Sequence, residues 1–376
     1  MATPSAPPVD PRVGRTVDEI DTPALVLDLD RFDANARRML ATIRAGGKDW
    51  RPHSKGHKAP WIANRQVAMG AIGVTCGKVG EAEVMVAGGI ASVLVANELA
   101  ARVKLERLAR LLDRAEVMSC ADAPYHVELA SLVGQDAGVE IPLVVDVDIG
   151  MERTGVKPGR PALELARAID RALGVRFAGI MGYEGHTLTL WPQEDRLAAT
   201  AESVAGLVET KRLIEADGIP VPIVSGGGSG DHEEAAALDG MTELQAGGAC
   251  LMDLFYGLDC HLEERGFEYA LHVITTVTSR PSPDRVITDA GFKALSQRQE
   301  MDPRIAGRPD LSLVYLSAEH GRWSRERDGP DVAIGDRLSV IPDYHDTTTF
   351  RHDEFVGVRD GRVEVVIPLL ARGRLA

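Results

Sequence analysis

Cysteine is scarce in this sequence, and the cysteines that occur are far apart. Cys76, Cys120, Cys250 and Cys260 form no Cys-x-x-Cys pair. Neither a disulfide framework nor a zinc site of paired cysteines is therefore expected. Widely separated thiols are typical of a reducing compartment, so we expect a cytoplasmic protein with free cysteines.

Long apolar runs and blocks of basic residues are also missing. The longest apolar runs have the length of strands, well short of the roughly 20 residues that a membrane helix needs. The opening MATPSAPPVDPR has no apolar segment of a signal peptide, so we expect a loose tail. Lys and Arg number 42 against 56 Asp and Glu, a formal net charge of −14. Nucleic acids and membranes are therefore not expected as partners. We expect a small-molecule substrate instead.

What the sequence does contain is one repeated pattern. Short strand-like runs that end in small or polar residues alternate with segments of helical spacing, such as 98–115 and 161–174. Eight such units favour a parallel (β/α)₈ barrel of the TIM type, an α/β fold, which we place at residues 31–268. The eight runs are 50–55, 72–78, 91–97, 115–122, 141–150, 177–186, 221–230 and 243–253.

The last quarter of the chain has a different rhythm. Strand-like runs separated by Gly, Pro and Asp predict an all-β C-terminal domain over 269–376. The Asp-Gly pair in RDGR, residues 359–362, is typical of a tight hairpin. Residues 1–30 are expected to form a tail and a strand associated with that domain. We expect the charged stretch 318–331 to be a solvated loop, with a lid or an interface as the alternatives.

The residues with unusual chemistry follow the predicted barrel strands. Lys55 follows the first strand in RPHSKGHK, Arg153 the fifth, and Tyr183 and His186 the sixth. Strand ends of a barrel meet at one mouth, where barrel enzymes carry out their chemistry. A surface loop is the ordinary interpretation of a basic stretch, but the shared position favours a site.

The run SGGGSG, residues 225–230, follows the seventh strand. Consecutive glycines with flanking serines let the backbone approach an anion and present N–H and O–H donors to it. A flexible linker is the alternative, and the buried strand directly before the run disfavours it. No Lys-Ser or Lys-Thr follows, as a nucleotide loop would require, so we expect another phosphate. A phosphate cradle and a lysine at two strand ends suggest pyridoxal phosphate.

Here the sequence resembles a known family. RPHSKGHK, DVDIGMERTGV, GYEGH, SGGGSG, AEHG and IGDRLSVIPDYHD occur in the order seen in the D-threonine aldolase and D-serine dehydratase family, over about residues 20–375. The resemblance implies the alanine-racemase-type barrel, pyridoxal 5'-phosphate as cofactor, a D-amino acid substrate and a homodimer.

Site residues follow from the resemblance position by position. Lys55 is implied as the Schiff-base lysine and Lys58 as its neighbour, and His53 lies close enough in the chain to contact the cofactor lysine. Arg153 matches the arginine near the cofactor's ring nitrogen. Tyr183 and His186 match positions that contact the ring, and the phosphate is assigned to Ser225, Gly226, Gly227, Gly228 and Ser229.

The resemblance also implies a divalent metal ion, Mg, Mn or Zn, but the sequence departs from the pattern there. The family holds the ion with His-x-Cys or His-x-Asp, whereas IPDYHD has Tyr344 at the histidine position, followed by His345 and Asp346. Adjacent residues diverge on a regular strand, so either a bulge turns His345 inward or the site is altered. His345 and Asp346 are the candidate ligands. Without a metal, Tyr344 or His345 is the candidate catalytic acid or base.

Three functions are compatible with these residues. The first is a lyase on D-3-hydroxy amino acids; Asp346 at the position of the dehydratase cysteine favours aldol cleavage over dehydration to a 2-oxo acid and ammonia. The second is an amino acid racemase, with Tyr344 as the second base. The third is a cofactor-binding protein without activity, which the extra β domain disfavours.

Overall fold

The computed structural model divides the chain into two compact units, and it describes residues 10–298 and 301–376. Residues 1–9, part of the expected tail, lie outside the described residues. We call the units the barrel unit and the β unit. The barrel unit consists of Asn35–Cys250, Leu258–Phe267 and Leu370–Ala376, and the β unit of the chain up to Ala34, Leu251–Gly257 and Glu268–Leu369.

The barrel unit contains an eight-stranded, all-parallel sheet with the order β2-β9-β8-β7-β6-β5-β4-β3. Its two end strands are also connected, because Trp50 O accepts from Ile72 N–H at 2.9 Å and His53 forms a parallel bridge with Thr75. The sheet thus closes, as the eight repeated runs predicted. The strands are β2 (Asp49–Trp50), β3 (Val74–Cys76), β4 (Ser92–Glu98), β5 (Glu116–Ala121), β6 (Ile141–Asp146), β7 (Val175–Met181), β8 (Ile223–Gly226) and β9 (Glu243–Leu244).

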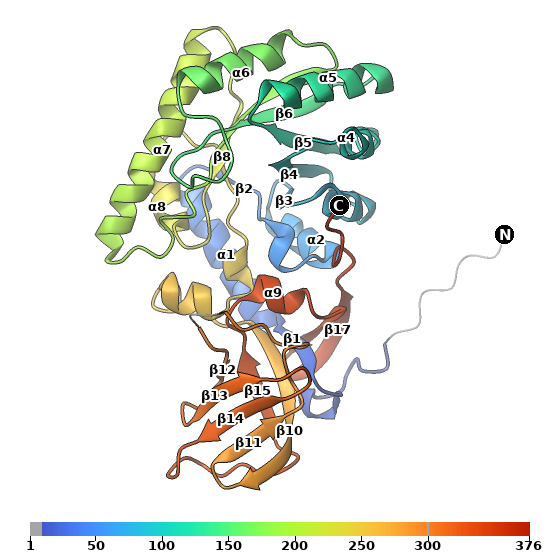
Figure 1. Ribbon diagram of the computed structural model, residues 1–376, viewed down its shortest axis with the longest axis vertical. Coiled ribbons are helices and arrows are strands. Elements are labelled where there is room, and N and C mark those ends of the chain that lie inside the picture. Colours follow the sequence, from blue (N-terminus) through green and yellow to red (C-terminus); the bar gives the residue numbers. More distant parts are fainter. Residues whose placement is uncertain (1–9, 299–300) are drawn as a thin grey trace, which may run out of the picture. The chain divides into compact units, whose positions relative to one another are not determined.

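Helices follow the strands and cover the barrel, and in Figure 1 α5, α6 and α7 lie outside the strands. Helix α6 buries Ala162, Leu165, Ala166 and Ile169, the spacing of one helical face. Proline stands in the first turn of α2, α5 and α6, where its missing N–H costs no hydrogen bond. The helices are α1 (Leu29–Ala45), α2 (Pro60–Met69), α3 (Val79–Ala87), α4 (Arg102–Ala109), α5 (Pro124–Ala137), α6 (Arg160–Arg171), α7 (Gln193–Ala216) and α8 (His232–Ala237).

The β unit is built on a mostly antiparallel sheet with the order β13-β14-β11-β10-β1-β16-β17, and β15 pairs with β10 and β12. The N-terminal strand β1 is antiparallel to β10 and parallel to β16. Its apolar side chains pack with those of β10, β16 and β17 around Val26, Ile274 and Val356. The strands are β1 (Ala24–Asp28), β10 (Leu271–Ser282), β11 (Arg285–Thr288), β12 (Arg304–Ile305), β13 (Leu311–Leu316), β14 (Gly321–Arg325), β15 (Arg337–Ile341), β16 (Glu354–Arg359) and β17 (Arg362–Pro368).

Local details of the β unit agree with the sequence at one hairpin and differ at two other segments. Asp360 and Gly361 both have positive φ, at 49° and 73°, as the predicted Asp-Gly hairpin requires. The stretch 318–331 is not wholly a solvated loop, because β14 crosses it and buries Trp323 completely. The strand expected through 346 stops at Ile341, and a short helix, α9 (His345–Thr349), follows.

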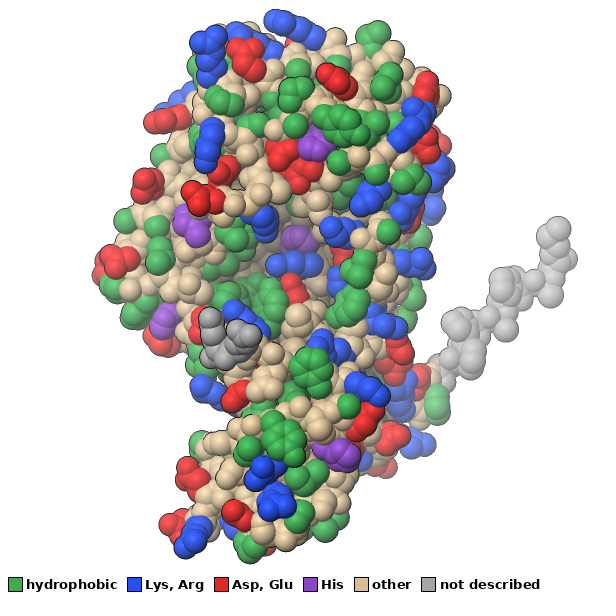
Figure 2. All heavy atoms as spheres, in the orientation of Figure 1, with side chains coloured by type: hydrophobic (Ala, Val, Ile, Leu, Met, Phe, Trp, Pro, Cys, Tyr) green, Lys and Arg blue, Asp and Glu red, His purple; other side chains and the backbone are tan. Residues whose placement is uncertain are grey.

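The surface carries charges of both signs. Over the face shown in Figure 2, Lys and Arg side chains are interspersed with Asp and Glu. No helix within residues 10–298 and 301–376 has the length and apolar character needed to cross a membrane.

Two helical glycines give a matched test of the barrel's packing. A Cβ on Gly134 in α5 would lie 1.9 Å from Gly174 O, whereas a Cβ on Gly206 in α7 would meet atoms no closer than 3.5 Å. We expect Gly134→Ala to destabilise the protein by about 1–3 kcal/mol through overpacking. Gly206→Ala should stabilise it by about 0.5–1 kcal/mol through helix propensity. Urea unfolding of both variants measures this, and equal effects would contradict the packing described.

Candidate active site

The loop that carries Lys55 begins directly after β2. His53 caps a short 3₁₀ turn, Ser54–Gly56, and its Nδ1 accepts the backbone N–H of Lys55 at 3.1 Å. The backbone N–H of His53 donates to Gln245 O at 3.0 Å, in the segment that follows β9. Lys55 therefore stands at the carboxyl end of a barrel strand, in a turn whose backbone is fixed from both sides.

The neighbouring lysine, Lys58, has a carboxylate partner on the next helix. Lys58 forms a buried ion pair with Glu81 at the start of α3. The other oxygen of Glu81 accepts from Gly77 N–H at 2.8 Å and from Lys78 N–H at 3.1 Å. These contacts tie Lys58 to the next strand–helix connection.

Two glycine-containing loops follow the next two strands of the sheet, and the second of them lies beside the Lys55 loop. The first is the predicted run after β8, where Gly227 has φ of 76°. The second follows β9, and a Cβ on Gly247 would be 2.5 Å from His53 O. Glycine at 247 therefore lets the second loop pack directly on the backbone of the Lys55 loop.

The serines of the first loop bond to the second. Ser225 Oγ accepts from Gln245 Nε2 at 2.9 Å, and Ser229 Oγ accepts from Ala249 N–H at 3.1 Å. Each serine oxygen is the acceptor in its contact, so its hydroxyl proton remains to be donated to an anion. The sequence prediction missed Gln245, Gly247 and Ala249. The run QAGGA after the eighth strand was the signal that could have identified them.

The backbone amides of the first loop are arranged differently from the prediction. Gly227 N–H donates to Glu184 Oε2 at 3.2 Å, and Gly228 N–H donates to Asp231 Oδ1 at 2.8 Å. Both carboxyl groups are fully buried. Two of the amides that we assigned to a phosphate thus have acceptors from the protein itself.

Arg153 and Tyr183 come together as the prediction required. The Arg153 guanidinium lies 5.6 Å from the centre of the Tyr183 ring. Carboxylates hold the loop directly after Arg153: Thr154 Oγ1 donates to Asp146 at 2.7 Å, and Gly155 N–H donates to Asp122 at 3.1 Å. Burial, together with the nearby Glu98, raises the pKa of Asp146 to about 7, against the lowering effect of the Thr154 hydrogen bond.

His186 lies against the same loop. A Cβ on Gly150 would be 2.6 Å from the His186 ring, and His186 Nε2 is 3.5 Å from Ser203 Oγ on α7. Burial raises the pKa of Tyr183 well above its usual range, so its phenol is held in the neutral form. Arg153, Tyr183 and His186 therefore belong to one cluster at the ends of β6 and β7.

The candidate metal ligands lie in the β unit. His345 begins α9 and is fully buried. Its Nδ1 lies 2.6 Å from Asp253 Oδ2, and its Nε2 lies 3.1 Å from Asp346 Oδ1. The helical start, and not a bulged strand, brings His345 and Asp346 together. Tyr344 caps this helix and donates its O–H to Asp346 Oδ2 at 3.0 Å.

His345 forms ion pairs with the two carboxylates, without hydrogen-bond geometry. At each ring nitrogen the carboxylate oxygen lies off the direction of the N–H bond. Burial lowers the pKa of His345, but the negative charges of Asp253 and Asp346 outweigh it and raise the pKa to about 9. Within the residues that the structure describes, no three His, Cys, Asp or Glu side chains are grouped to hold a metal ion.

Comparison with known proteins identifies the family. Residues 27–254 match the family model "Alanine racemase, N-terminal domain", and residues 270–358 match "Putative serine dehydratase domain". A D-threonine aldolase of an Arthrobacter species is 37% identical over 98% of this chain and 96% of its own. The chain belongs to the D-threonine aldolase family.

Other members of this family support the match over the full length. A 3-hydroxy-D-aspartate aldolase of Paracoccus denitrificans (strain Pd 1222) is 36% identical over 96% of this chain and 94% of its own. The crystal structure of a D-threonine aldolase from Filomicrobium marinum superposes with a TM-score of 0.92, at 36% identity over 97% of this chain and 99% of that one. The predicted alanine-racemase-type fold with its C-terminal β domain is confirmed.

The charge around His345 predicts a titration near pH 9. In protein freed of divalent cations, the His345 imidazolium should persist well above the ordinary pKa of about 6.5. Its folded-state pKa, about 9, exceeds the unfolded one, so it adds stability that is complete below pH 6.5 and is lost as the pH rises through 9. Asp253→Asn should lower this pKa, measured by NMR of histidine-labelled protein.

A buried carboxylate elsewhere in the β unit supplies the control. Asp310 pairs with Arg308, so Asp310→Asn should leave the titration of His345 unchanged. An Asp253→Asn variant that titrates as the wild type does would contradict the contact described.

Proposed function

We propose that this protein is a pyridoxal phosphate-dependent lyase that cleaves D-3-hydroxy amino acids into glycine, or another amino acid, and an aldehyde. The observation that carries the proposal is the position of Lys55. It stands at a strand end beside one glycine-containing loop, which is bonded in turn to the second, in a chain that matches D-threonine aldolase over 98% of its length.

The barrel residues fit this cofactor. Lys55 supplies the amine that would hold it covalently, and the hydroxyl protons of Ser225 and Ser229 are available to its phosphate. Arg153 supplies a cation for the ring nitrogen, held in place by the carboxylate contacts of its loop. When bound, the cofactor withdraws electrons from the substrate's Cα and so weakens the bonds to that atom.

The β unit supplies candidate ligands for a divalent cation. His345 Nε2 and Asp346 Oδ1 are 3.1 Å apart without hydrogen-bond geometry. A divalent cation bound here would take both atoms as ligands, since imidazole nitrogen and carboxylate oxygen are donors that such ions accept. Asp253 at Nδ1 would orient the ring, as carboxylates behind metal-binding histidines do. A bound Mg²⁺, Mn²⁺ or Zn²⁺ would acidify the 3-hydroxyl of the substrate.

Aldol cleavage balances without any other reactant. The 3-hydroxyl loses its proton, the Cα–Cβ bond breaks, the hydroxyl oxygen becomes the aldehyde oxygen, and Cα takes up a proton. We assign Tyr344 to the proton transfers, because its phenol is already bonded to Asp346. The homodimer and the cytoplasmic location stay predictions from the sequence.

Product analysis tests the reaction. Incubation with D-threonine, D-phenylserine and 3-hydroxy-D-aspartate should yield glycine and the corresponding aldehyde, and a chelator should slow the cleavage at least tenfold. The L-isomers serve as controls and should not react. Dehydration to a 2-oxo acid with ammonia, or conversion to the enantiomer, as the main product would contradict the proposal.

Lys55→Ala tests the cofactor attachment. We expect this variant to lose the visible absorbance that pyridoxal phosphate acquires when it is linked to the protein, because the other amine of this loop, Lys58, is held in a buried ion pair with Glu81. Lys104→Ala, on helix α4, is the control and should keep the band. Persistence of the band in Lys55→Ala would assign the attachment to another lysine.

A further inference from the structure

Two buried acidic residues hold the glycine loop from inside the barrel unit. Glu184 comes from the connection after β7, and Asp231 directly precedes α8. Their side chains accept the amides of Gly227 and Gly228, and each has no exposed surface. The mechanism proposed above uses neither residue.

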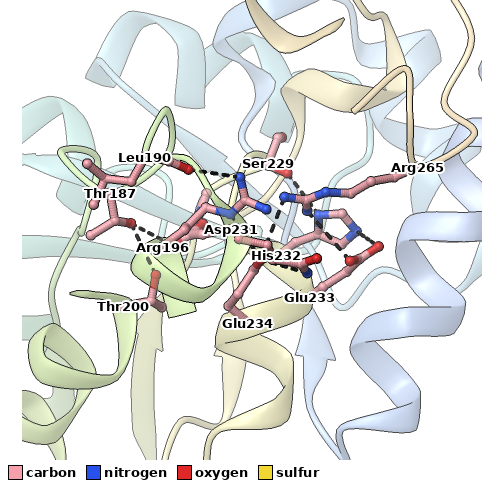
Figure 3. A network of polar contacts seen from close by, with 12 residues as sticks. Thr187, Leu190, Arg196, Thr200, Ser229, Asp231, His232, Glu233, Glu234 and Arg265 are labelled. Atoms are coloured by element: carbon pink, nitrogen blue, oxygen red, sulfur yellow. Dashed lines mark hydrogen bonds and ion pairs between the residues drawn. The ribbon is translucent and has the colours of Figure 1, made fainter. Parts of the chain in front are cut away.

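Further buried polar groups brace Asp231 (Figure 3). Thr187 Oγ1 donates to Glu184 O at 2.9 Å and lies 3.4 Å from Asp231 Oδ2, and Thr200 Oγ1 donates to Thr187 Oγ1 at 3.2 Å. Beyond them, Arg196 on α7 forms a buried ion pair with Glu234 on α8 at 2.9 Å. The acceptors of the glycine amides are therefore tied to two helices.

Burial disfavours the charged form of both acids. It raises the pKa of Glu184, and burial together with the charge of Glu184 raises the pKa of Asp231. The neutral form of each acid is therefore favoured more than in an exposed carboxyl group. A glutamine or asparagine side chain accepts through a neutral amide oxygen. At these two positions it should therefore hold the glycine N–H groups almost as well as a carboxyl group does.

The central glycines of the loop leave no room for side chains. A Cβ on Gly226 would lie 2.7 Å from Gly182 O, and one on Gly228 would lie 2.8 Å from Leu188 Cδ2. At these positions the loop is therefore anchored through its backbone groups. The contacts of Gly227 and Gly228 with the two acids, together with those of the serine oxygens with Gln245 and Ala249, hold Ser225 and Ser229 in place.

We propose that Glu184 and Asp231 are positioning residues that set the affinity for the phosphate group of the cofactor, by fixing the glycine loop through the amides of Gly227 and Gly228. This inference rests on the proposed pyridoxal phosphate site. The phosphate is bound by the serine hydroxyls, which the two acids hold in place, and not by the amides of Gly227 and Gly228.

Comparison of pyridoxal phosphate with pyridoxal isolates the phosphate contribution. Both aldehydes react with the same lysine, so the bond to the lysine contributes equally to both dissociation constants. The ratio of the two constants therefore measures the contribution of the phosphate group alone. We expect Glu184→Ala and Asp231→Ala to weaken the binding of pyridoxal phosphate to apoprotein about tenfold or more, with pyridoxal little affected. Glu184→Gln and Asp231→Asn keep an acceptor oxygen and should restore most of the affinity.

Two further variants complete the design. Asp217→Ala removes an exposed carboxylate at the end of α7, paired with Arg167, and should leave both constants unchanged. If the alanine variants do not fold, as judged by circular dichroism, Glu184→Asp replaces them. Its shorter side chain withdraws the oxygen from Gly227, so it should lose phosphate affinity in the same way.

The outcomes separate this inference from the proposed function. An unchanged ratio of the two constants in the alanine variants, or Gln and Asn variants as impaired as the alanine ones, would overturn the positioning role. A wild-type protein that binds neither pyridoxal phosphate nor pyridoxal would instead overturn the proposed function.

Discussion

The hydrogen bond from His53 N–H to Gln245 O is the contact on which the barrel site depends. It joins the turn after the first barrel strand to the segment after the last one, which lie 192 residues apart in the chain. Once these ends meet, Gly247 packs on the His53 backbone and Ala249 N–H reaches Ser229 Oγ. Lys55 and the glycine loop are neighbours because parallel strands 2, 9 and 8 are neighbours in the closed sheet.

The parts that could be predicted from the sequence are those that depend on local patterns. Each barrel strand is a short apolar run that ends in small or polar residues, and burial on both faces produces that pattern wherever a strand lies in a parallel sheet. Lys55 and Ser225–Ser229 could be located because strand ends share one face of a barrel. Their positions required no knowledge of individual contacts.

The sequence prediction missed two kinds of feature. One is a contact between residues that are distant in the chain, and the other is a helix that begins where a strand was predicted to continue. Glu184 bonds to a glycine 43 residues away, and Asp253 contacts a histidine 92 residues away, so no periodicity relates them. The prediction extended the strand of β15 through Asp346, whereas a helix begins at His345 with Tyr344 as its N-cap residue. A cap is decided by a few hydrogen bonds and leaves little mark on residue spacing.

Charge explains how an acidic protein could take an anionic cofactor. The net charge of −14 repels a phosphate at long range, but salt screens charges beyond about 8–10 Å, so binding depends on groups next to the anion. Near the glycine loop the protein places two acids, yet burial raises their pKa values and their oxygens face the amides. Hydroxyls, which carry no charge to desolvate, then become the donors suited to the phosphate. The acids stabilise the loop through hydrogen bonds, and the same burial that raises their pKa values favours the form that brings no charge to the phosphate.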